Sequence, residues 1–269
     1  MVIIMHEIKI DQLYFAYQEK IEVLKGINLT LRNESTAIIG QNGAGKTTFV
    51  KLLKRLLRPT KGNIFYNGEN LQGYTAANLS KHIGLVFQNP NEQIFKSKVI
   101  DEVMFGPLNV GQNEEQAKRS AHNALDAVGL ASYGDENPYD LSLAERKMVA
   151  IASILAMDTD VIIFDEPTMG QDLEGKKRIK SIIRNLRKQG KLVICILHDM
   201  DFAAEIFERI IVLNQGEVLV DGHPKEVFAN KSVLKEAHLE QPYVMQIANR
   251  LGIDGVFLTE EELIERLKT

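Results

Sequence analysis

Apolar and polar residues alternate along the first part of the chain, over residues 6–17 and 22–31. A period of two predicts strands with one face exposed to water, and such strands pair in antiparallel sheets. Two later segments, 159–167 and 191–199, contain continuous apolar runs instead, which are typical of strands buried on both faces. Further strands are expected at 35–40, 63–68 and 81–88, with a hairpin over 209–222 turned at Asn214-Gln215-Gly216.

Helical patterns alone occupy the chain between the strand at 81–88 and the one at 159–167. This block predicts a helical subdomain of about residues 89–157, inserted into an α/β domain with a mixed-sheet core. We expect that domain to span residues 1–222, and residues 223–269 to form a helical C-terminal extension. The expected helices are 47–57, 97–108, 113–130, one starting at 142, 174–190, 201–209 and three in the extension, 225–237, 242–252 and 259–268.

Three of these helices begin with the spacing of a capping box, in which Ser, Thr or Asn is followed three residues later by Glu or Gln. The pair at residue 142 precedes a long apolar run, so a capped helix is expected to begin within LSLAERK, residues 141–147. The three pairs are Asn113 with Gln116, Ser142 with Glu145, and Thr259 with Glu262.

The composition of the chain limits the classes of protein to which it can belong. The chain has 269 residues, 45% of them hydrophobic and 25% charged, which suits a folded protein with a sizeable core. The formal net charge of −4, without a block of like charges, argues against nucleic acid as a partner. The single cysteine, Cys195, excludes a disulfide framework and favours a reducing compartment. No apolar run approaches the length of a membrane span, so a role at a membrane would depend on partner proteins.

Residues 40–47, GQNGAGKT, match the phosphate-binding P-loop pattern G-x-x-x-x-G-K-[ST]. The pattern follows a predicted strand and opens a predicted helix, as its mechanism requires. Glycines let several backbone N–H groups point at one anion, and the helix adds the positive end of its dipole. Lys46 would contact the β- and γ-phosphates, and Thr47 would offer its hydroxyl to Mg²⁺. A glycine turn that merely joins a strand to a helix is the alternative.

Two carboxylates stand at the end of a predicted buried strand in VIIFDEP, Val161–Pro167. Ligands of open α/β sheets bind at the carboxyl ends of the strands. There Asp165 would hold Mg²⁺ through water, and Glu166 would orient and polarise the attacking water. Phosphoryl transfer depends mainly on positioning and charge stabilisation, so a metal and one well-placed carboxylate can suffice. The alternative is an Asp-Glu pair that only faces solvent.

Five motifs, in this order, resemble those of ABC transporter ATPase subunits. They are the P-loop, Gln88 in VFQNP, LSLAER at 141–146, FDEP at 164–167 and His198 in LHD. The resemblance covers residues 7–228. It implies a P-loop NTPase fold with a RecA-like mixed-sheet core, an N-terminal antiparallel β-subdomain and the inserted helical subdomain. It also implies an enzyme that hydrolyses ATP with Mg²⁺.

The resemblance further implies roles for single residues. Tyr17 would stack on adenine, Gln88 would contact Mg²⁺ and the attacking water, and His198 would reach the γ-phosphate. Asp172 would lie at an interface between two ATPase subunits. The residues expected to bind ATP are Tyr17, Gly40, Asn42, Gly43, Ala44, Gly45, Lys46, Thr47, Thr48 and Ser142. The expected metal ligands are Thr47, Gln88 and Asp165, and the expected catalytic residues are Glu166, His198 and Gln88.

Within that family, the chain is most similar to the ATPase subunits of energy-coupling factor transporters, which import vitamins and transition-metal ions. The stretches that carry this resemblance are FQNPNEQIFKSKVIDEVMFGPLNVG (87–111), EPTMGQD (166–172) and the helical tail. The resemblance implies a head-to-tail dimer of two ATPases, often non-identical, at the cytoplasmic face of the membrane. It also implies a transmembrane energy-coupling subunit, docked on the segment after Gln88, and a small membrane subunit that binds the substrate.

The chain departs from the family at the motif Leu-Ser-Gly-Gly-Gln, whose two glycines are replaced by Leu143 and Ala144. In the family this helix start approaches the γ-phosphate held by the other subunit, and glycine permits that approach because it has no Cβ. We therefore expect a competent P-loop site and an impaired opposite site, as in a heterodimer. Gln171 is a second departure, since the family has an apolar residue there, and the sequence gives it no role.

Other functions remain open at this level. A DNA-repair or chromosome ATPase of this superfamily would need a long coiled coil between its motif halves, and a translation-factor ATPase would need two tandem copies. Neither feature is found in the sequence. A conventional ABC transporter ATPase for another substrate class and a non-catalytic nucleotide-binding module are the remaining alternatives. Glu166 and His198 argue against the second of these.

Overall fold

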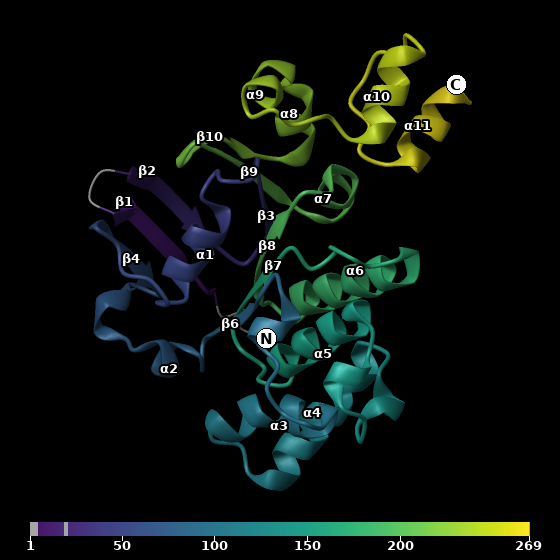
Figure 1. Cartoon of the computed structure of the whole chain (residues 1–269). Helices are drawn as coiled ribbons and strands as arrows, with labels where there is room; N and C mark the ends of the chain where they lie inside the picture. The colour runs from purple at the N-terminus through teal and green to yellow at the C-terminus, as the bar shows by residue number, and fades with distance from the viewer. Residues whose placement is uncertain (1–4, 19–20, 269) are drawn as a thin grey trace.

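The structure is a computed structural model that describes residues 5–18 and 21–268, so the outermost ends of the two expected domains, residues 1–4 and 269, lie outside it. Within the described ranges the strands form a four-stranded and a six-stranded sheet. The smaller, antiparallel sheet is the N-terminal β-subdomain and lies beside the larger one (Figure 1). Its order is β2 (Ile21–Leu31), β1 (Ile8–Gln18), β4 (Lys61–Tyr66) and β5 (Glu69–Asn70).

The six-stranded sheet is mixed, as the fold class predicted. Its order is β10 (Glu217–Gly222), β9 (Arg209–Asn214), β3 (Ser35–Ile39), β8 (Leu192–Leu197), β7 (Val161–Asp165) and β6 (Ile83–Val86). The strands from β9 to β6 run parallel, and β10 is the antiparallel hairpin partner of β9. Gln215 and Gly216 make the hairpin turn with φ of 47° and 86°, the positive values that a tight turn of this kind needs.

The continuous apolar runs arise because this sheet is covered on both faces. Side chains alternate between the faces of a strand. Along β8, Val193, Cys195 and Leu197 belong to one hydrophobic layer, and Leu192, Ile194 and Ile196 belong to the other. The second layer also holds the antiparallel sheet. The first holds the helical subdomain and much of the C-terminal extension.

Helices cover the six-stranded sheet and form the inserted subdomain (Figure 1). None of the helices in the described part of the chain is long and apolar enough to cross a lipid bilayer. The helices outside the C-terminal extension are α1 (Lys46–Leu53), α2 (Ala76–Leu79), α3 (Val99–Asn109), α4 (Glu114–Ala127), α5 (Leu143–Leu155), α6 (Leu173–Lys188) and α7 (Met200–Ile206).

Two of the three predicted capping boxes form in full, at Asn113 for α4 and at Ser142 for α5. The third forms by half. Thr259 accepts a hydrogen bond from the Glu262 N–H, but the Glu262 carboxylate accepts from Leu258 N–H at 2.7 Å instead of reaching the N-cap. Lys225 explains the difference, because its ammonium lies 2.8 Å from the Glu262 carboxylate and fixes that side chain elsewhere.

The C-terminal extension has four helices in the described residues, so the prediction of three was wrong. Its expected first helix is broken at Asn230, whose φ of −81° and ψ of 78° are not helical. The Asn230 side chain accepts a hydrogen bond from Val233 N–H at 3.2 Å and begins a new helix, a role in which asparagine is favoured. The helices are α8 (Pro224–Ala229), α9 (Lys231–Glu236), α10 (Tyr243–Arg250) and α11 (Glu260–Leu267).

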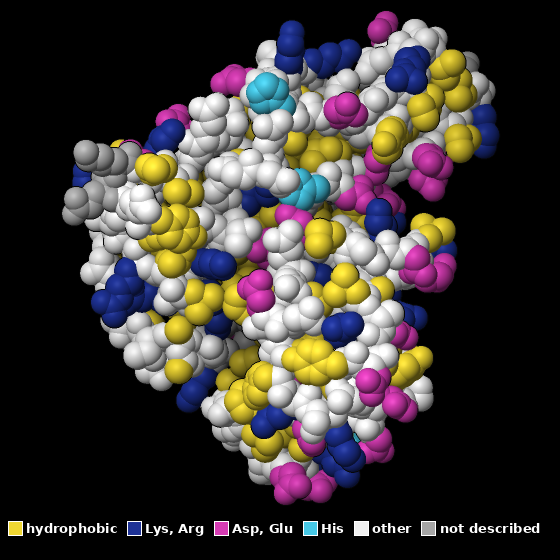
Figure 2. Space-filling model, in the orientation of Figure 1, with side chains coloured by type: hydrophobic (Ala, Val, Ile, Leu, Met, Phe, Trp, Pro, Cys, Tyr) yellow, Lys and Arg dark blue, Asp and Glu magenta, His cyan; other side chains and the backbone are white. Residues whose placement is uncertain are grey.

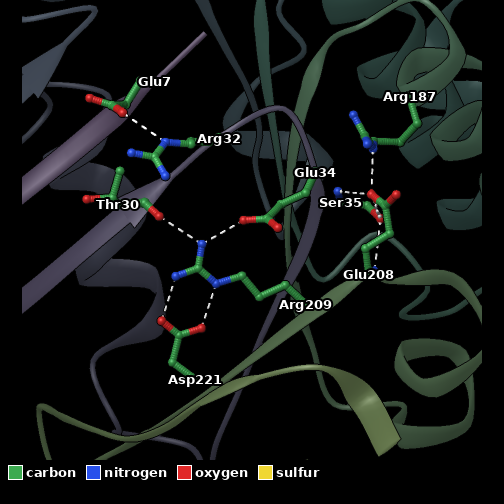
Figure 3. Close-up of polar contacts among 9 residues, drawn as sticks. All are labelled: Glu7, Thr30, Arg32, Glu34, Ser35, Arg187, Glu208, Arg209 and Asp221. Atoms are coloured by element: carbon green, nitrogen blue, oxygen red, sulfur yellow. Dashed lines mark hydrogen bonds and ion pairs between the residues drawn. The ribbon is translucent and has the colours of Figure 1, made fainter. Parts of the chain in front are cut away.

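An arginine joins the two sheets (Figure 3). Arg209 is the first residue of β9, so this contact lies at the opposite end of the strand from its carboxyl end. The Arg209 guanidinium makes two 2.5 Å contacts with Asp221 and donates to Glu34 at 2.7 Å and to the Thr30 carbonyl at 2.8 Å. Its side chain is only 17% exposed. The two facing carboxylates raise the pKa of Arg209. This fork-shaped pairing fixes β2 and β10 against the parallel strands.

Candidate functional site

The predicted phosphate-binding and catalytic residues meet at the carboxyl ends of four neighbouring parallel strands. In the order β3, β8, β7 and β6, the segments after these strands contain the P-loop, His198, Glu166 and Gln88. Because the strands are parallel, their carboxyl ends share one edge of the sheet. The fold therefore brings together four segments that are widely separated in the sequence.

The P-loop is held in its turn by close backbone contacts. Gly40 has φ of 156°, and a Cβ there would lie 2.1 Å from the Leu213 carbonyl oxygen. Gly45 has φ of 102°, and a Cβ there would lie 2.7 Å from a methyl group of Leu24. Side chains are thus excluded at both positions. The helix α1 then begins at Lys46 without a side-chain cap, which leaves its first N–H groups available to an anion.

The remaining P-loop residues differ in exposure. Ala44 is buried, whereas Asn42 and Gly43 lie on the outer turn of the loop, and Gly43 has open space where a Cβ would be. Thr48 is 8% exposed and Thr47 is half-buried beside Asp165. The outer turn is therefore the open side of the loop.

The Lys46 ammonium is folded back on its own loop. It donates to the carbonyl oxygens of Gly40 at 2.7 Å and Gln41 at 2.9 Å. Burial lowers the pKa of Lys46, and the nearby carboxylates of Glu166 and Asp165 oppose that shift. A phosphate group would exchange these carbonyl contacts for charge-assisted ones, which are stronger.

Asp165 has the features of a metal ligand. It is 3% exposed, and its Oδ1 is buried without a hydrogen-bond partner. Burial raises the pKa of Asp165 to about 6, the charge of Glu166 adds to this, and the hydroxyl of Thr47 acts against it. An orphaned buried oxygen is unfavourable unless a ligand satisfies it. Mg²⁺ prefers such hard oxygen donors, so Asp165 and Thr47 fit this ion.

Glu166 is held at both carboxylate oxygens. Its Oε2 accepts from the Gln88 side-chain amide at 2.8 Å, and its Oε1 lies 2.7 Å from Nε2 of His198. Its backbone has φ of 50°, an uncommon value for a residue with a side chain, and its N–H donates to the Ile196 carbonyl at 3.1 Å. The β7–β8 pairing thus sets an unusual backbone conformation that aims this carboxylate between β6 and β8.

Tyr17 lies close to the first turn of α1. Its hydroxyl is 3.2 Å from Oγ1 of Thr48, and its ring packs edge-on against Phe15 with centroids 4.8 Å apart. The Tyr17 side chain is nevertheless 60% exposed. A ring fixed at its edge, with exposed surface next to a phosphate site, suits stacking on a planar base.

The structure does not bring Ser142 to the P-loop of its own chain. Ser142 is the N-cap of α5, and its hydroxyl donates to Glu145 at 2.7 Å. No hydrogen bond joins it to residues 40–48 in the described part of the chain. Leu143, the first residue of α5, is 51% exposed. Ser142 and Leu143 thus form an outward-facing helix start.

Two polar residues near this site had no role assigned from the sequence, although Gln171 was noted as a departure from the family. Lys147 is 2% exposed and donates to the carbonyl oxygens of Phe87, at 3.1 Å, and of Gln88. Gln171 donates from its side-chain amide to the Ala144 carbonyl at 3.0 Å. The signal for Lys147 in the sequence was a lysine at the edge of an apolar helical run. The signal for Gln171 was a polar residue in place of an apolar one.

The fold and this sheet edge define a P-loop nucleoside triphosphatase. The chain belongs to the ABC transporter family, because residues 24–169 match the model of that family, which is described as ABC transporter. It is accordingly an ATP-hydrolysing cassette, as the sequence predicted.

The chain is similar to three further proteins. A Pyrococcus furiosus protein assigned to the ABC transporter ATP-binding proteins is 41% identical over 95% of this chain and 98% of its own length. The energy-coupling factor transporter ATP-binding protein EcfA of Methanocaldococcus jannaschii is 38% identical over 92% of this chain and 90% of its own. The structure of CbiO1 from Clostridium perfringens, part of the ABC transporter complex CbiONQ, has a TM-score of 0.76 and 33% identity, covering 90% of this chain and 98% of that one.

Proposed function

We propose that this chain is the ATP-hydrolysing subunit of an energy-coupling factor type importer for vitamins or transition-metal ions. The observation that carries its catalytic role is the carboxylate of Glu166, held by Gln88 on one oxygen and by His198 on the other. Such a carboxylate, fixed beside a phosphate loop, can orient a water molecule and accept its proton. The likeness to EcfA and CbiO1 supports the importer type.

In this proposal the P-loop N–H groups and Lys46 bind the phosphates, and Tyr17 stacks on adenine. Thr47, Asp165 and Gln88 hold Mg²⁺, which neutralises phosphate charge when it is bound. Glu166 takes the proton of the attacking water while Gln88 and His198 hold its carboxylate in place. A carboxylate held by two partners needs little reorganisation during the reaction.

The second ATP-binding half comes from another ATPase subunit in a head-to-tail dimer. The outward-facing helix start at Ser142 supports this, because it contacts no P-loop residue of its own chain among those described. Leu143 would place an exposed side chain between that helix start and the partner's γ-phosphate. We therefore propose a non-identical partner with intact glycines, one competent site at this chain's P-loop, and one impaired site opposite.

The C-terminal extension would add to the contact between ATPase subunits. Apolar side chains gather on the surface over α10 and α11 (Figure 2). Such a patch on a protein surface commonly marks an interface. The exposed apolar residues there are Tyr243, Ile247, Leu251, Ile264 and Leu267.

The transmembrane subunit would dock near the segment that follows Gln88, and the chain would then lie at the cytoplasmic face of the membrane. The rings of Phe95 and Phe105 meet edge to face at 4.7 Å, and both are partly exposed. The Lys96 ammonium lies over each ring, and the buried Glu102 accepts from the N–H groups of Phe95 and Lys96 at 2.9 Å. A preformed aromatic surface of this kind fits an inserted helix.

ATPase assays of the chain alone and with its partner test the heterodimer. We expect weak turnover alone and vigorous turnover in the pair, and equal turnover would refute the unequal-site proposal. In the pair, Glu166→Gln should remove nearly all hydrolysis and leave a stable ATP-bound dimer. Retention of half the activity would mean that the opposite site also works. Co-purification with membrane subunits separates an importer from a non-catalytic nucleotide-binding module.

A further inference from the structure

A buried lysine lies between the start of α5 and the catalytic edge of the sheet. Lys147 is 2% exposed, and its ammonium donates to the backbone carbonyls of Phe87 and Gln88, just past the end of β6. Burial lowers the pKa of Lys147 to about 8, while the charges of Asp165 and Glu166 oppose the shift. A buried cation is unfavourable unless polar partners surround it, so a buried lysine at this position calls for a functional explanation.

The lysine belongs to a row of contacts between α5 and residues 87–93, which we call the Gln88 segment. Arg146 donates to the Asn91 side chain at 2.9 Å. One turn further, the Gln93 amide donates to the Ala150 carbonyl at 2.8 Å and to the Ser153 hydroxyl at 2.8 Å. The contacts recur along one face of the helix, so α5 and the Gln88 segment form one unit.

This unit contacts Glu166, the proposed catalytic base. The carbonyl of Gln88 is held by Lys147, and the side-chain amide of the same residue donates to Glu166 at 2.8 Å. Gln88 is thus held in place through its backbone carbonyl, and its side chain contacts Glu166. A shift of its backbone would move the amide away from the carboxylate, and small misplacements at a reacting centre are expensive.

We propose that Lys147 is a positioning residue for ATP hydrolysis, one that fixes the Gln88 backbone so that the Gln88 amide holds Glu166 in its catalytic orientation. The proposal rests on the proposed catalytic role of Glu166. It also joins the base to the helix start at Ser142, which lies five residues before Lys147 on the same helix. Movement of that helix start then reaches Glu166 through the side chains of Lys147 and Gln88.

The chain offers a matched control at the other end of β6. Lys54 is also buried, at 9% exposure, and burial lowers its pKa to about 8. It donates to the Ser80 hydroxyl at 2.8 Å and to the Ile83 carbonyl. Lys54 thus holds the first residue of β6, whereas Lys147 holds the two residues that follow the strand, and only Lys147 holds Gln88. Replacing either one removes a buried cation, so both variants should lose stability.

The test compares Lys147→Met with Lys54→Met in the whole chain, purified together with the subunits that bind it. For Lys147→Met we expect kcat per folded molecule to fall about 10- to 100-fold. Affinity for a fluorescent ATP analogue should stay within about twofold, because the P-loop is intact. Lys54→Met should keep kcat within about twofold once corrected for folded protein. Equal losses of kcat in the two variants would overturn the proposal.

A double-mutant cycle with Gln88→Ala separates positioning from general stability. If Lys147 acts through Gln88, its replacement should cost little further kcat once the amide is gone. Additive losses would contradict that route. If Lys147→Met does not fold, Lys147→Gln keeps an amide donor but is too short to hold both carbonyls, and kcat should again fall at unchanged ATP affinity.

Glu166→Gln distinguishes this inference from the proposed function. If that variant keeps normal turnover, the assignment of the base is wrong. If it abolishes turnover while Lys147→Met matches Lys54→Met, the base stands and the role given to Lys147 is wrong.

Discussion

Restoring the two missing glycines should raise the ATPase activity of the isolated chain. In Leu143→Gly/Ala144→Gly, the backbone at the start of α5 could approach the phosphate bound by a second copy, since no Cβ would intervene. Removing one backbone or side-chain donor from a site of this kind typically lowers kcat by about 100-fold or more. We therefore expect the glycine variant to gain at least about tenfold in kcat.

The structure also sets the cost of this change. Leu143 is the first residue of α5 and is 51% exposed, so its replacement by glycine loses about half the burial energy of a fully buried leucine. Two glycines within the first turn add a propensity penalty. Together these changes should lower the free energy of unfolding by about 2 kcal/mol. The capping box of Ser142 and Glu145 remains, so the helix should still form.

Phosphate release by the full-length chain, with Mg²⁺ and ATP and normalised to folded protein, measures the outcome. Helix α4 provides the control, because Asn113 and Gln116 cap it with the same kind of box. Glu114→Gly/Glu115→Gly should cost comparable stability and leave turnover unchanged. An unchanged rate in the folded, ATP-binding signature variant would refute the reasoning, as would an equal rise in the α4 control.

Three further outcomes are expected. The pKa of Asp165 is raised from 3.8 to about 6, so the folded apo protein holds that proton more tightly than the unfolded chain does. The free energy of unfolding of the protein without ligand should therefore rise by up to about 3 kcal/mol as pH falls through 6 towards 4. The stabilisation by Mg²⁺ with ATP should fade below pH 6. Thermal unfolding with and without Mg²⁺ and ATP at several pH values measures both trends. Tyr17→Ala should weaken ATP binding about tenfold, whereas Tyr17→Phe, which loses only the hydroxyl contact with Thr48, should bind as the parent does in a titration with a fluorescent analogue. Arg209→Met should lower the free energy of unfolding by about 3 kcal/mol in denaturant titrations, and Arg32→Met, at an exposed ion pair, by less than about 1 kcal/mol.

The fold could be predicted wherever the signal was local. The apolar runs of β7 and β8, the P-loop turn and the capping boxes of α4 and α5 each follow from a few neighbouring residues. The break at Asn230 was missed because the apolar period continues across it, and the deciding hydrogen bond to Val233 N–H competes with the helix.

The site was predictable as a set of residues but not as a set of contacts. The strand order brings Gln88 and His198 to opposite oxygens of Glu166, and that order is a property of the whole sheet. Lys147 meets carbonyls that lie 59 and 60 residues away, so no local pattern could reveal its partners. Gln171 likewise finds its partner, the Ala144 carbonyl, 27 residues earlier.

The central sheet separates the apolar interior into two layers. The P-loop helix and the antiparallel sheet pack in one of them, and α3 to α5 with most of the C-terminal extension pack in the other. Substitutions in the apolar contacts of α3, α4 and the C-terminal extension therefore leave the packing of the P-loop helix unchanged, whereas α5 stays coupled to the site through Lys147. During evolution the surfaces of α3, α4 and the C-terminal extension could therefore change without repacking the interior that supports the P-loop helix.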